Sequence, residues 1–276
     1  MGLSQASHSP PLAMRQYAVF GDPIAHSKSP LLHNRVFLEL GVPAFYGRYH
    51  LKEPSSLLER FHALGLEGAN ITVPFKEVAF EQCDEVRGIA QKIGSVNTMV
   101  KEGERVIGYN TDAEGFFQTL EGKIRPQNVL ILGAGGTAKA LAMIFDLHQI
   151  PVTILNRTPG RLKPLAEQGF KTLTHEEFAP NSYDLIINST SAGLSDDSLP
   201  LPAPWLESLL HSGVLAYDVI YGKTTPFLRL AKAQGARFQD GREMLISQAA
   251  LSSLHFTEHH FPLSTLHSLM RLALPQ

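Results

Sequence analysis

The sequence predicts an α/β protein with two domains, and three observations support this. The chain has 276 residues, and at roughly 150 residues per domain this length indicates about two domains. Apolar runs of strand length alternate with amphipathic stretches of helix length, the pattern of βαβ units around a mostly parallel sheet. A glycine-rich turn, Gly133–Ala138, separates one such run from a helical stretch, as in nucleotide-binding sheets.

Three segments show the alternation in the first half of the chain. Tyr17–Gly21 and Ala69–Val73 are short apolar runs and are predicted to be buried strands. Ser29–Leu40 is predicted to be a helix, and Pro30 suits its first turn because proline lacks the N–H that this turn leaves unpaired. We assign these segments to a first domain, residues 1–112, that holds the substrate.

A second series of apolar runs follows, and helical segments separate its members. The predicted strands are Asn128–Leu132, Val152–Leu155, Leu185–Asn188 and Leu215–Val219. This series predicts a doubly wound, Rossmann-type sheet in a second domain, residues 113–244.

The chain after Gly241 is predicted to be helical to its end. We expect the helices within residues 245–276 to pack back on the first domain. The expected buried positions are Met244, Leu245, Ala249 and Leu254.

Composition and charge exclude several classes of protein. The 24 Lys and Arg residues nearly balance 26 Asp and Glu residues, with a net charge of -2, so no basic surface for nucleic acid or an anionic membrane is expected. No apolar run approaches the ~20 residues that span a bilayer, and Met1–Gln16 has no signal-peptide pattern. The single cysteine, Cys83, cannot form an intrachain disulfide, which favours a reducing compartment. We expect a cytoplasmic protein with a small-molecule partner. The sequence is compatible with a homodimer but does not predict the oligomeric state.

The histidines do not indicate a metal site or a hydrolase. His255, His259 and His260 have helical spacing, but neighbouring positions face different directions and no carboxylate or cysteine set completes a ligand shell. His26 lies beside Ser27 without a G-x-S-x-G turn. No metal is expected.

The glycine-rich turn has the G-x-G-x-x-A spacing of a dinucleotide-binding motif. It comprises Gly133, Ala134, Gly135, Gly136, Thr137 and Ala138, directly after a predicted strand and before the predicted helix Lys139–Leu147. The first glycine permits the tight turn, and the second lets backbone amides approach a pyrophosphate. The small Ala138 allows close helix packing, and the helix N-terminus favours an anion. An ordinary tight turn is the alternative.

The end of the next predicted strand favours NADP over NAD. Enzymes that use NAD place an Asp or Glu there for the ribose 2′-hydroxyl, whereas this chain has Asn156, Arg157 and Thr158, followed by Arg161. Planar guanidinium groups suit a 2′-phosphate. A solvated helix start is the alternative.

Polar clusters follow or end the apolar runs of the first half. They are Ser27–Ser29, Asn70–Lys76, Asn97–Thr98 and Asn110–Asp112. Together they would make a pocket for a small polyhydroxylated acid. Each cluster alone is equally typical of a turn or a helix cap.

These motifs together resemble the shikimate dehydrogenase family, from Tyr17 to about Phe256. Gly21–Pro30 resembles the opening motif of the family, and Asn70–Lys76 resembles the motif with its catalytic lysine. Val96–Thr98 and Gly108–Asp112 are similar to two further motifs of the family. The resemblance extends through the glycine-rich turn and the Asn156–Arg161 segment.

The resemblance implies an enzyme of chorismate and aromatic amino-acid biosynthesis that reduces 3-dehydroshikimate reversibly to shikimate with NADPH. It implies catalytic roles for Lys76 and Asp112, which handle the proton as a pair. The implied substrate residues are Ser27, Ser29, Thr72, Lys76, Asn97, Asp112, Tyr221 and Gln248. The implied cofactor residues, beyond the turn and the Asn156–Arg161 segment, are Thr190, Val219, Gly241 and Met244.

Other functions remain open at this point. One is a quinate/shikimate dehydrogenase of broader specificity, another a related enzyme for an aminated ring acid. A third is a catalytically silent NADP or shikimate sensor, because fold does not fix function. The segment Gly222–Pro226 departs from the family pattern, since many members have a proline soon after the residue that matches Tyr221.

Overall fold

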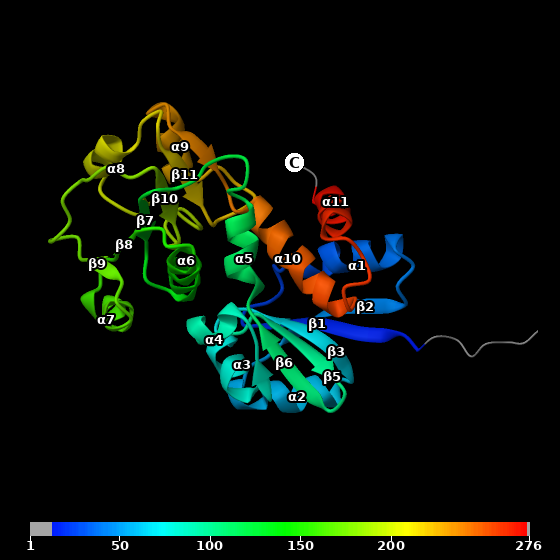
Figure 1. Ribbon diagram of the computed structural model, residues 1–276. Coiled ribbons are helices and arrows are strands. Elements are labelled where there is room, and N and C mark those ends of the chain that lie inside the picture. The colour runs from blue at the N-terminus through cyan, green and yellow to red at the C-terminus, as the bar shows by residue number, and fades with distance from the viewer. Residues whose placement is uncertain (1–12, 275–276) are drawn as a thin grey trace, which may run out of the picture.

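The structure, a computed structural model, describes residues 13–274. Residues 1–12 and 275–276 lie outside the described part, and with them most of the segment considered above as a signal peptide. The described strands form two six-stranded sheets, which occupy different halves of the molecule (Figure 1).

The first sheet has the order β2-β1-β3-β5-β6-β4. Its strands are β1 (Arg15–Gly21), β2 (Ala44–His50), β3 (Leu66–Ile71), β4 (Glu85–Val86), β5 (Thr98–Glu102) and β6 (Arg105–Tyr109). The helices between them are α1 (Ser29–Glu39), the 3-10 turn η1 (Pro54–Ser56), α2 (Leu57–Ala63), α3 (Lys76–Gln82) and α4 (Ile89–Ile93). β1 pairs in parallel with β2 and β3, whereas β5 runs antiparallel to β3 and β6.

The second sheet has the order β12-β11-β10-β7-β8-β9. Its strands are β7 (Val129–Leu132), β8 (Val152–Leu155), β9 (Lys171–Leu173), β10 (Leu185–Asn188), β11 (Leu215–Asp218) and β12 (Arg237–Gln239). The helices along this part of the chain are α5 (Thr111–Gln118), α6 (Gly136–Leu147), α7 (Pro159–Glu167), α8 (Ala203–Leu209) and α9 (Pro226–Ala233). All neighbouring strands of this sheet are parallel.

Helices cover both faces of the second sheet. Val129 and Ile131 of β7 pack in one apolar cluster, whereas Leu130 and Leu132 pack in another. Successive side chains of a strand point to opposite faces, so two separate clusters mean two covered faces. This is the predicted α/β, doubly wound arrangement.

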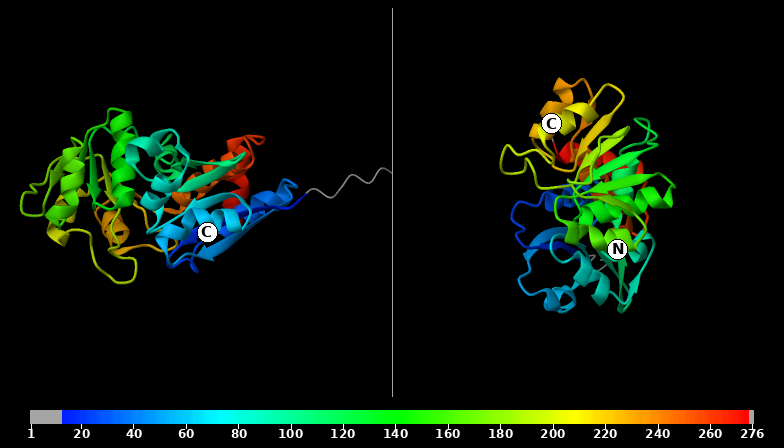
Figure 2. Two further views of the ribbon diagram at one scale, coloured as in Figure 1. Left: turned by 90° about the horizontal axis from the view of Figure 1, so that it is seen from below. Right: turned by 90° about the vertical axis from the view of Figure 1, so that its left-hand side faces the viewer.

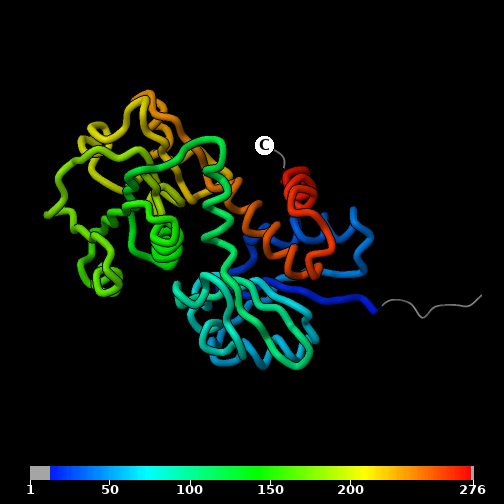
Figure 3. The backbone as a smooth tube through the Cα atoms, in the orientation of Figure 1, coloured from blue at the N-terminus to red at the C-terminus, as the bar shows by residue number. Residues whose placement is uncertain are grey.

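Two helices cross between the sheets. The backbone passes from the first sheet to the second through α5 and returns through α10 (Arg242–Phe256) (Figure 3). The two helices touch at Gly115, where a Cβ atom would lie 2.6 Å from the backbone nitrogen of Gln248. Glycine at this position therefore permits the close helix contact.

The C-terminal helices α10 and α11 (Leu263–Ala273) pack against the first sheet. Tyr17 and Val19 of β1 share an apolar cluster with Ile246 of α10 and Met270 of α11. In both Figure 1 and the left view of Figure 2, the red C-terminal helix lies on the side of the blue N-terminal elements, away from the green and yellow half.

Several predicted elements need correction. The chain after Gly241 is not helical throughout. It is interrupted between α10 and α11, because Glu258 and His259 adopt positive φ angles and Pro262 cannot continue a helix. Of its expected buried positions, Met244 and Ala249 are buried, whereas Leu245 and Leu254 are only partly buried. α6 begins at Gly136, earlier than the predicted Lys139.

Two further differences concern strands. β3 ends at Ile71 instead of Val73, and Pro74, three residues after Ile71, has no N–H for a ladder. The second sheet also contains the short edge strands β9 and β12, which have few apolar residues.

None of the helices within residues 13–274 has the length and apolar character needed to cross a membrane.

Candidate functional site

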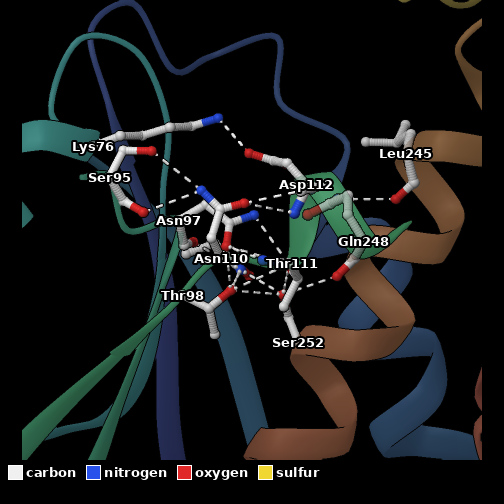
Figure 4. Close-up of polar contacts among 12 residues, drawn as sticks. Lys76, Ser95, Asn97, Thr98, Asn110, Thr111, Asp112, Leu245, Gln248 and Ser252 are labelled. Atoms are coloured by element: carbon white, nitrogen blue, oxygen red, sulfur yellow. Dashed lines mark hydrogen bonds and ion pairs between the residues drawn. The ribbon is translucent and has the colours of Figure 1, made fainter. Parts of the chain in front are cut away.

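Lys76 and Asp112 form an ion pair between the first sheet and the crossing helix α5. Lys76 is the first residue of α3, and Asp112 lies in the first turn of α5. Their Nζ and Oδ2 atoms lie 2.6 Å apart, and their side chains are 24% and 16% exposed. Figure 4 shows the two side chains pointing toward one another. A partly exposed ammonium group and carboxylate are thus available to a ligand from the same side.

Local hydrogen bonds fix the position of Asp112. The side-chain oxygen of Asn110 caps α5 by accepting hydrogen bonds from the backbone N–H groups of Asp112 and Ala113. The Asn97 Oδ1 atom accepts a hydrogen bond of 2.8 Å from the Thr111 N–H, and the Asn97 Nδ2 atom donates to the Thr111 hydroxyl. The first turn of α5 is therefore tied to the end of the first sheet.

Asn97 is 2% exposed, and its amide is engaged with Thr111. The structure places Asn97 against Thr111, the residue before Asp112, where it supports the first turn of α5 and is not a free amide. Its predicted contact with substrate stays a prediction.

A buried polar network extends from this point, and the sequence analysis missed it. The Ser252 hydroxyl of α10 lies within hydrogen-bond distance of the Thr98 and Thr111 hydroxyls, at 2.9 and 3.1 Å. Figure 4 shows Thr98, Thr111 and Ser252 close together, and the Asn70 amide donates to the Ser252 and Thr98 oxygens. Serine and threonine in a helix or strand carry no local signal for such a network, because its members are far apart in sequence.

Ser27 and Ser29 lie together at the start of α1. Their hydroxyl oxygens are 3.3 Å apart, and the Ser29 N–H donates to the Ser27 hydroxyl. Arg48 of β2 donates two hydrogen bonds, of 3.0 and 2.6 Å, to the Ser27 carbonyl oxygen. The sequence analysis gave no role to Arg48, which holds the loop before α1.

Thr72 follows β3 and packs on the loop that follows β1. Its N–H donates to the Phe20 carbonyl oxygen. A Cβ atom on Gly21 would lie 2.5 Å from the Thr72 methyl group. The second polar cluster therefore packs against the end of the neighbouring strand β1.

Gln248 and Tyr221 come from the later part of the chain. Gln248 lies on α10, and its side-chain amide donates to the Leu245 carbonyl oxygen of the same helix. Tyr221 follows β11 and is partly buried, and burial raises the pKa of its hydroxyl. Within the described residues, neither side chain is hydrogen-bonded to the Lys76–Asp112 pair.

A polar cavity of about 1040 Å³ lies at one edge of the second sheet. It is lined by residues that follow β7, β8 and β10, since the carboxyl ends of parallel strands meet at one edge. The predicted cofactor residues that line it are Gly133, Ala134, Gly135, Asn156, Arg157, Thr158, Arg161 and Thr190.

The glycine-rich turn has the conformation that the sequence predicts. Gly133 has a φ angle of 109°, and a Cβ atom there would lie 2.8 Å from the Ser189 hydroxyl oxygen. Gly135 precedes α6 as its N-cap and has open space where a Cβ would be. The first-turn amides of α6, at Gly136 and Thr137, lack partners within the helix. Gly136 and Thr137 are not among the residues that line the cavity, but they directly follow Gly135, which is. Ala138 is fully buried in the core.

The remaining predicted cofactor residues lie outside the cavity lining. A Cβ atom on Gly241 would lie 2.1 Å from the Val219 carbonyl oxygen, so these two residues are in contact. Met244 is 9% exposed and packs in the core of the second sheet. The structure brings Val219 and Gly241 together, but not with the glycine-rich turn.

A buried carboxylate supports the loop that carries Thr190. Asp218, at the end of β11, has no exposed surface and accepts hydrogen bonds from Thr225, Asn188 and Ile220. The Asn188 Oδ1 atom in turn accepts from the hydroxyl and the N–H of Thr190. Burial raises the pKa of Asp218. The sequence analysis missed Asp218 as a support of the cavity.

Replacing this carboxylate is expected to destabilise the protein. Asp218→Asn substitutes an NH₂ group for one acceptor oxygen and leaves a buried donor unpaired, which costs about 1–3 kcal/mol. We expect urea denaturation to report a loss of this size. Asp197→Asn is the control, because Asp197 pairs with Arg229 at the surface with 89% of its side chain exposed. Equal stability of both variants would contradict the supporting role.

The fold and these two regions define a class of protein. A doubly wound sheet with a G-x-G-x-x-A turn and two arginines just after β8 is typical of dinucleotide-binding α/β proteins. In this chain, a Lys–Asp pair also lies between the first sheet and α5.

Comparisons with known proteins narrow this class. The family model for the shikimate dehydrogenase substrate binding domain matches residues 19–99, and the model for shikimate / quinate 5-dehydrogenase matches residues 116–195. A shikimate dehydrogenase (NADP(+)) of Helicobacter hepaticus is 51% identical over 238 residues, which cover 86% of this chain and 88% of the relative. One from Helicobacter pylori is 46% identical, with coverage of 94% and 99%.

A solved structure gives the same result. Shikimate 5-dehydrogenase of Thermus thermophilus, in complex with NADP(H) and shikimate, superimposes with a TM-score of 0.83 at 35% identity, covering 95% of this chain and 100% of the other. The chain belongs to the shikimate dehydrogenase family. The resemblance predicted from the sequence is confirmed.

Proposed function

We propose that this protein is an NADP-dependent shikimate dehydrogenase that reversibly reduces 3-dehydroshikimate to shikimate in aromatic amino-acid biosynthesis. The observation that supports this function most directly is the 2.6 Å ion pair between Lys76 and Asp112. The same chain has a cavity suited to a dinucleotide at the edge of its second sheet. Curated relatives at 46–51% identity carry the name shikimate dehydrogenase (NADP(+)), which supports both substrate and cofactor.

The residues of the cavity fit NADP. The glycine-rich turn leaves open space at Gly135 and amides at the start of α6, which suit a pyrophosphate. The end of β8 has Arg157 and Arg161 and no carboxylate, and these guanidinium groups would hold a 2′-phosphate. When bound, the nicotinamide supplies the hydride to the ring ketone or accepts it from the alcohol.

The Lys76–Asp112 pair handles the proton. In the reduction, the Lys76 ammonium group donates a proton to the oxygen that develops negative charge, and in the oxidation the amine takes the proton back. Asp112 orients Lys76 through their hydrogen bond. The other substrate contacts that we propose are Ser27, Ser29, Thr72, Asn97, Tyr221 and Gln248.

We propose the remaining cofactor contacts on the family match. Thr190 lines the cavity, and Val219, Gly241 and Met244, which belong to the same half of the molecule, would contact the nicotinamide half of the cofactor. We also propose that the two halves close around the bound substrate. The domain division at residues 112/113 and 244/245 falls inside α5 and α10, so these helices would be the hinges of such a closure. A smaller radius of gyration in solution scattering with shikimate and NADP would support it, and an unchanged one would refute it.

We also propose a cytoplasmic location, because the single Cys83 suits a reducing compartment. Analytical ultracentrifugation would measure the oligomeric state, and a homodimer is one expected outcome.

The direct test is absorbance of reduced nicotinamide with purified protein. Rapid reduction of NADP by shikimate, with slow reaction for NAD or quinate, would support the proposal. Comparable rates with quinate would favour the broader enzyme instead. Binding of both ligands without turnover in any combination would overturn the enzymatic function in favour of a sensor.

Arg157→Ala is expected to raise the KM for NADP about tenfold and to leave the KM for NAD nearly unchanged. The reason is the loss of a charge-assisted hydrogen bond to the 2′-phosphate, worth about 1.5 kcal/mol or more. Initial rates with each cofactor provide the measurement. Arg125→Ala, an exposed arginine that does not line the cavity, is the control. Equal weakening of both cofactors would contradict the assignment.

A further inference from the structure

β8 and β9 end side by side at the edge of the cofactor cavity. They are parallel, Leu155 pairs with Leu173, and the Asn156 N–H donates to the Leu173 carbonyl oxygen at 3.2 Å. Two residues beyond this pair, just past the ends of the two strands, come Arg157 and His175. Both line the cavity. The register of the sheet thus sets an imidazole beside the guanidinium group assigned above to the 2′-phosphate.

The turn that carries His175 is held by a reciprocal cap. The Thr174 N–H donates to the Glu177 carboxylate at 2.8 Å, and the Glu177 N–H donates to the Thr174 hydroxyl at 3.3 Å. This is the capping-box pattern of Thr followed three residues later by Glu. On its other side, the His175 ring meets the ring of Trp205 of α8 edge to face, with centroids 6.1 Å apart. Contacts within the protein therefore fix the position of the imidazole before any ligand binds.

The groups around His175 make this end of the cavity basic. Arg157 follows β8, and Arg161 lies on α7. Burial lowers the pKa of His175 most, and the positive charge of Arg157 lowers it further. The carboxylate of Glu176, in the same turn, raises it.

The carboxylates that share the cavity have partners of their own. Asp196 accepts from the Ser198 hydroxyl at 2.6 Å, and Asp197 pairs with Arg229 at 2.8 Å. The imidazole thus lacks a carboxylate partner of its own among the hydrogen bonds of residues 13–274, and a phosphate beside Arg157 would be the anion it meets.

We propose that His175 is a specificity-determining contact for the 2′-phosphate of NADP, and that it takes up a proton from solvent as this phosphate binds. The proposal rests on the assignment of NADP as cofactor and adds a residue to it. A 2′-phosphate carries between one and two negative charges near neutral pH, and next to it the protonated imidazole gains a charge-assisted hydrogen bond. NAD has a hydroxyl at this position and offers no such gain.

The consequence is a pH dependence that distinguishes the two cofactors. As pH falls from about 8 toward 6, the phosphate-bound His175 becomes protonated before the free one, so the affinity for a 2′-phosphate rises. The phosphate itself also titrates in this range, with a second pKa near ~6, in the wild type and in every variant. Only the difference between the wild-type protein and a His175 variant isolates the imidazole.

The test uses isothermal titration calorimetry with 2′,5′-ADP as the probe and 5′-AMP as the matched ligand without the 2′-phosphate. Titrations at pH 6.5 and 8.0, in two buffers of different ionisation enthalpy, give the affinity and the number of protons taken up. The proteins are the wild type, His175→Gln, His175→Lys and His211→Gln. His211 is an exposed residue outside the cavity lining and serves as the control.

We expect His175→Gln to lower the affinity for 2′,5′-ADP about fivefold at pH 6.5, the size of a partly exposed ion pair, and to bind 5′-AMP as the wild type does. Its proton uptake should also fall below that of the wild type. His175→Lys should restore the affinity at both pH values without restoring the extra uptake, which separates charge from mere packing. His211→Gln should behave as the wild type.

The outcomes separate this proposal from the proposed function. If the wild type prefers 2′,5′-ADP over 5′-AMP but His175→Gln has the same affinity and proton uptake, the role of His175 is overturned while NADP remains the cofactor. If the wild type shows no preference for 2′,5′-ADP, the NADP assignment itself fails. If His175→Gln weakens both ligands equally, His175 supports the cavity and does not read the phosphate, which also overturns the proposal.

Discussion

Lys76→Ala is expected to lower kcat for shikimate oxidation by about three orders of magnitude and to change the KM for shikimate only modestly. General acid–base catalysis contributes about 10²- to 10⁴-fold to a rate, and a group that acts only in the transition state affects kcat rather than ground-state binding. The Lys76 ammonium group is partly exposed and lies 2.6 Å from Asp112. Steady-state kinetics with saturating NADP provide the measurement.

Lys101→Ala is a matched control, because it also removes a lysine that is paired with a carboxylate. Lys101 lies 4.0 Å from Glu67, away from the Lys76–Asp112 pair and partly exposed. Lys101→Ala should keep kcat near that of the wild type. Circular dichroism and NADP binding should be unchanged in Lys76→Ala, because Asn110 and Asn97 hold the first turn of α5 independently of Lys76. Turnover within tenfold of the wild type would end the catalytic assignment.

Acid is expected to destabilise the protein through His33, below about pH 6.5. His33 of α1 is fully buried, stacks on Tyr46 with ring centroids 4.3 Å apart, and lies 2.8 Å from the Ser253 hydroxyl. Burial lowers its pKa from 6.5 to about 3, and the nearby side chain of Asn70 opposes this shift. The folded state therefore keeps the ring neutral, whereas the unfolded chain takes up a proton.

The sign of the effect follows from proton binding. Above pH 6.5 both states hold a neutral His33, and its contribution to stability is complete. As pH falls from 6.5 toward 3 the unfolded state binds one proton more, so the free energy of unfolding declines by about 1.4 kcal/mol per pH unit. His33→Phe keeps an aromatic ring and removes the titration, so its stability should fall less steeply between pH 6.5 and 4.5.

Urea denaturation at several pH values measures this slope. The exposed His62 provides the control: His62→Phe also removes one imidazole, and its slope should follow the wild type. Other buried groups contribute equally to the pH dependence of stability in all three proteins. One of them is His255, since burial lowers its pKa to about 4. If His33→Phe and the wild type lose stability in parallel, His33 is not the group that titrates.

Much of the second sheet was predictable because its signals are local. Strands β7, β8, β10 and β11 are apolar runs buried on both faces, and the glycine-rich turn follows the first of them directly. The first sheet was less predictable. β2 mixes aromatic and charged residues at a sheet edge. β5 and β6 pair antiparallel and carry the charged residues Lys101, Glu102 and Arg105 where they meet, so only short apolar runs mark them.

The residues of the candidate site also fall into two groups, those that the sequence could predict and those that it could not. Ser27, Thr72, Lys76 and Asp112 were predicted by their motifs, whose residues are neighbours in sequence. Ser252 was not, because its contacts with Thr98 and Thr111 join positions more than 140 residues apart. Arg48, Asp218 and His175 were missed for the same reason, since each acts on a segment far from its own.

The sequence by itself determined the α/β class, the dinucleotide turn and the basic end of β8, because turn geometry and the chemistry of a strand end are set by residues a few positions apart. Only the tertiary structure decided that Lys76 meets Asp112, that Asn97 is held by Thr111, and that α10 crosses between the sheets. These contacts arise where packing brings distant segments together, such as the Gly115–Gln248 approach of α5 and α10, and no local pattern specifies them.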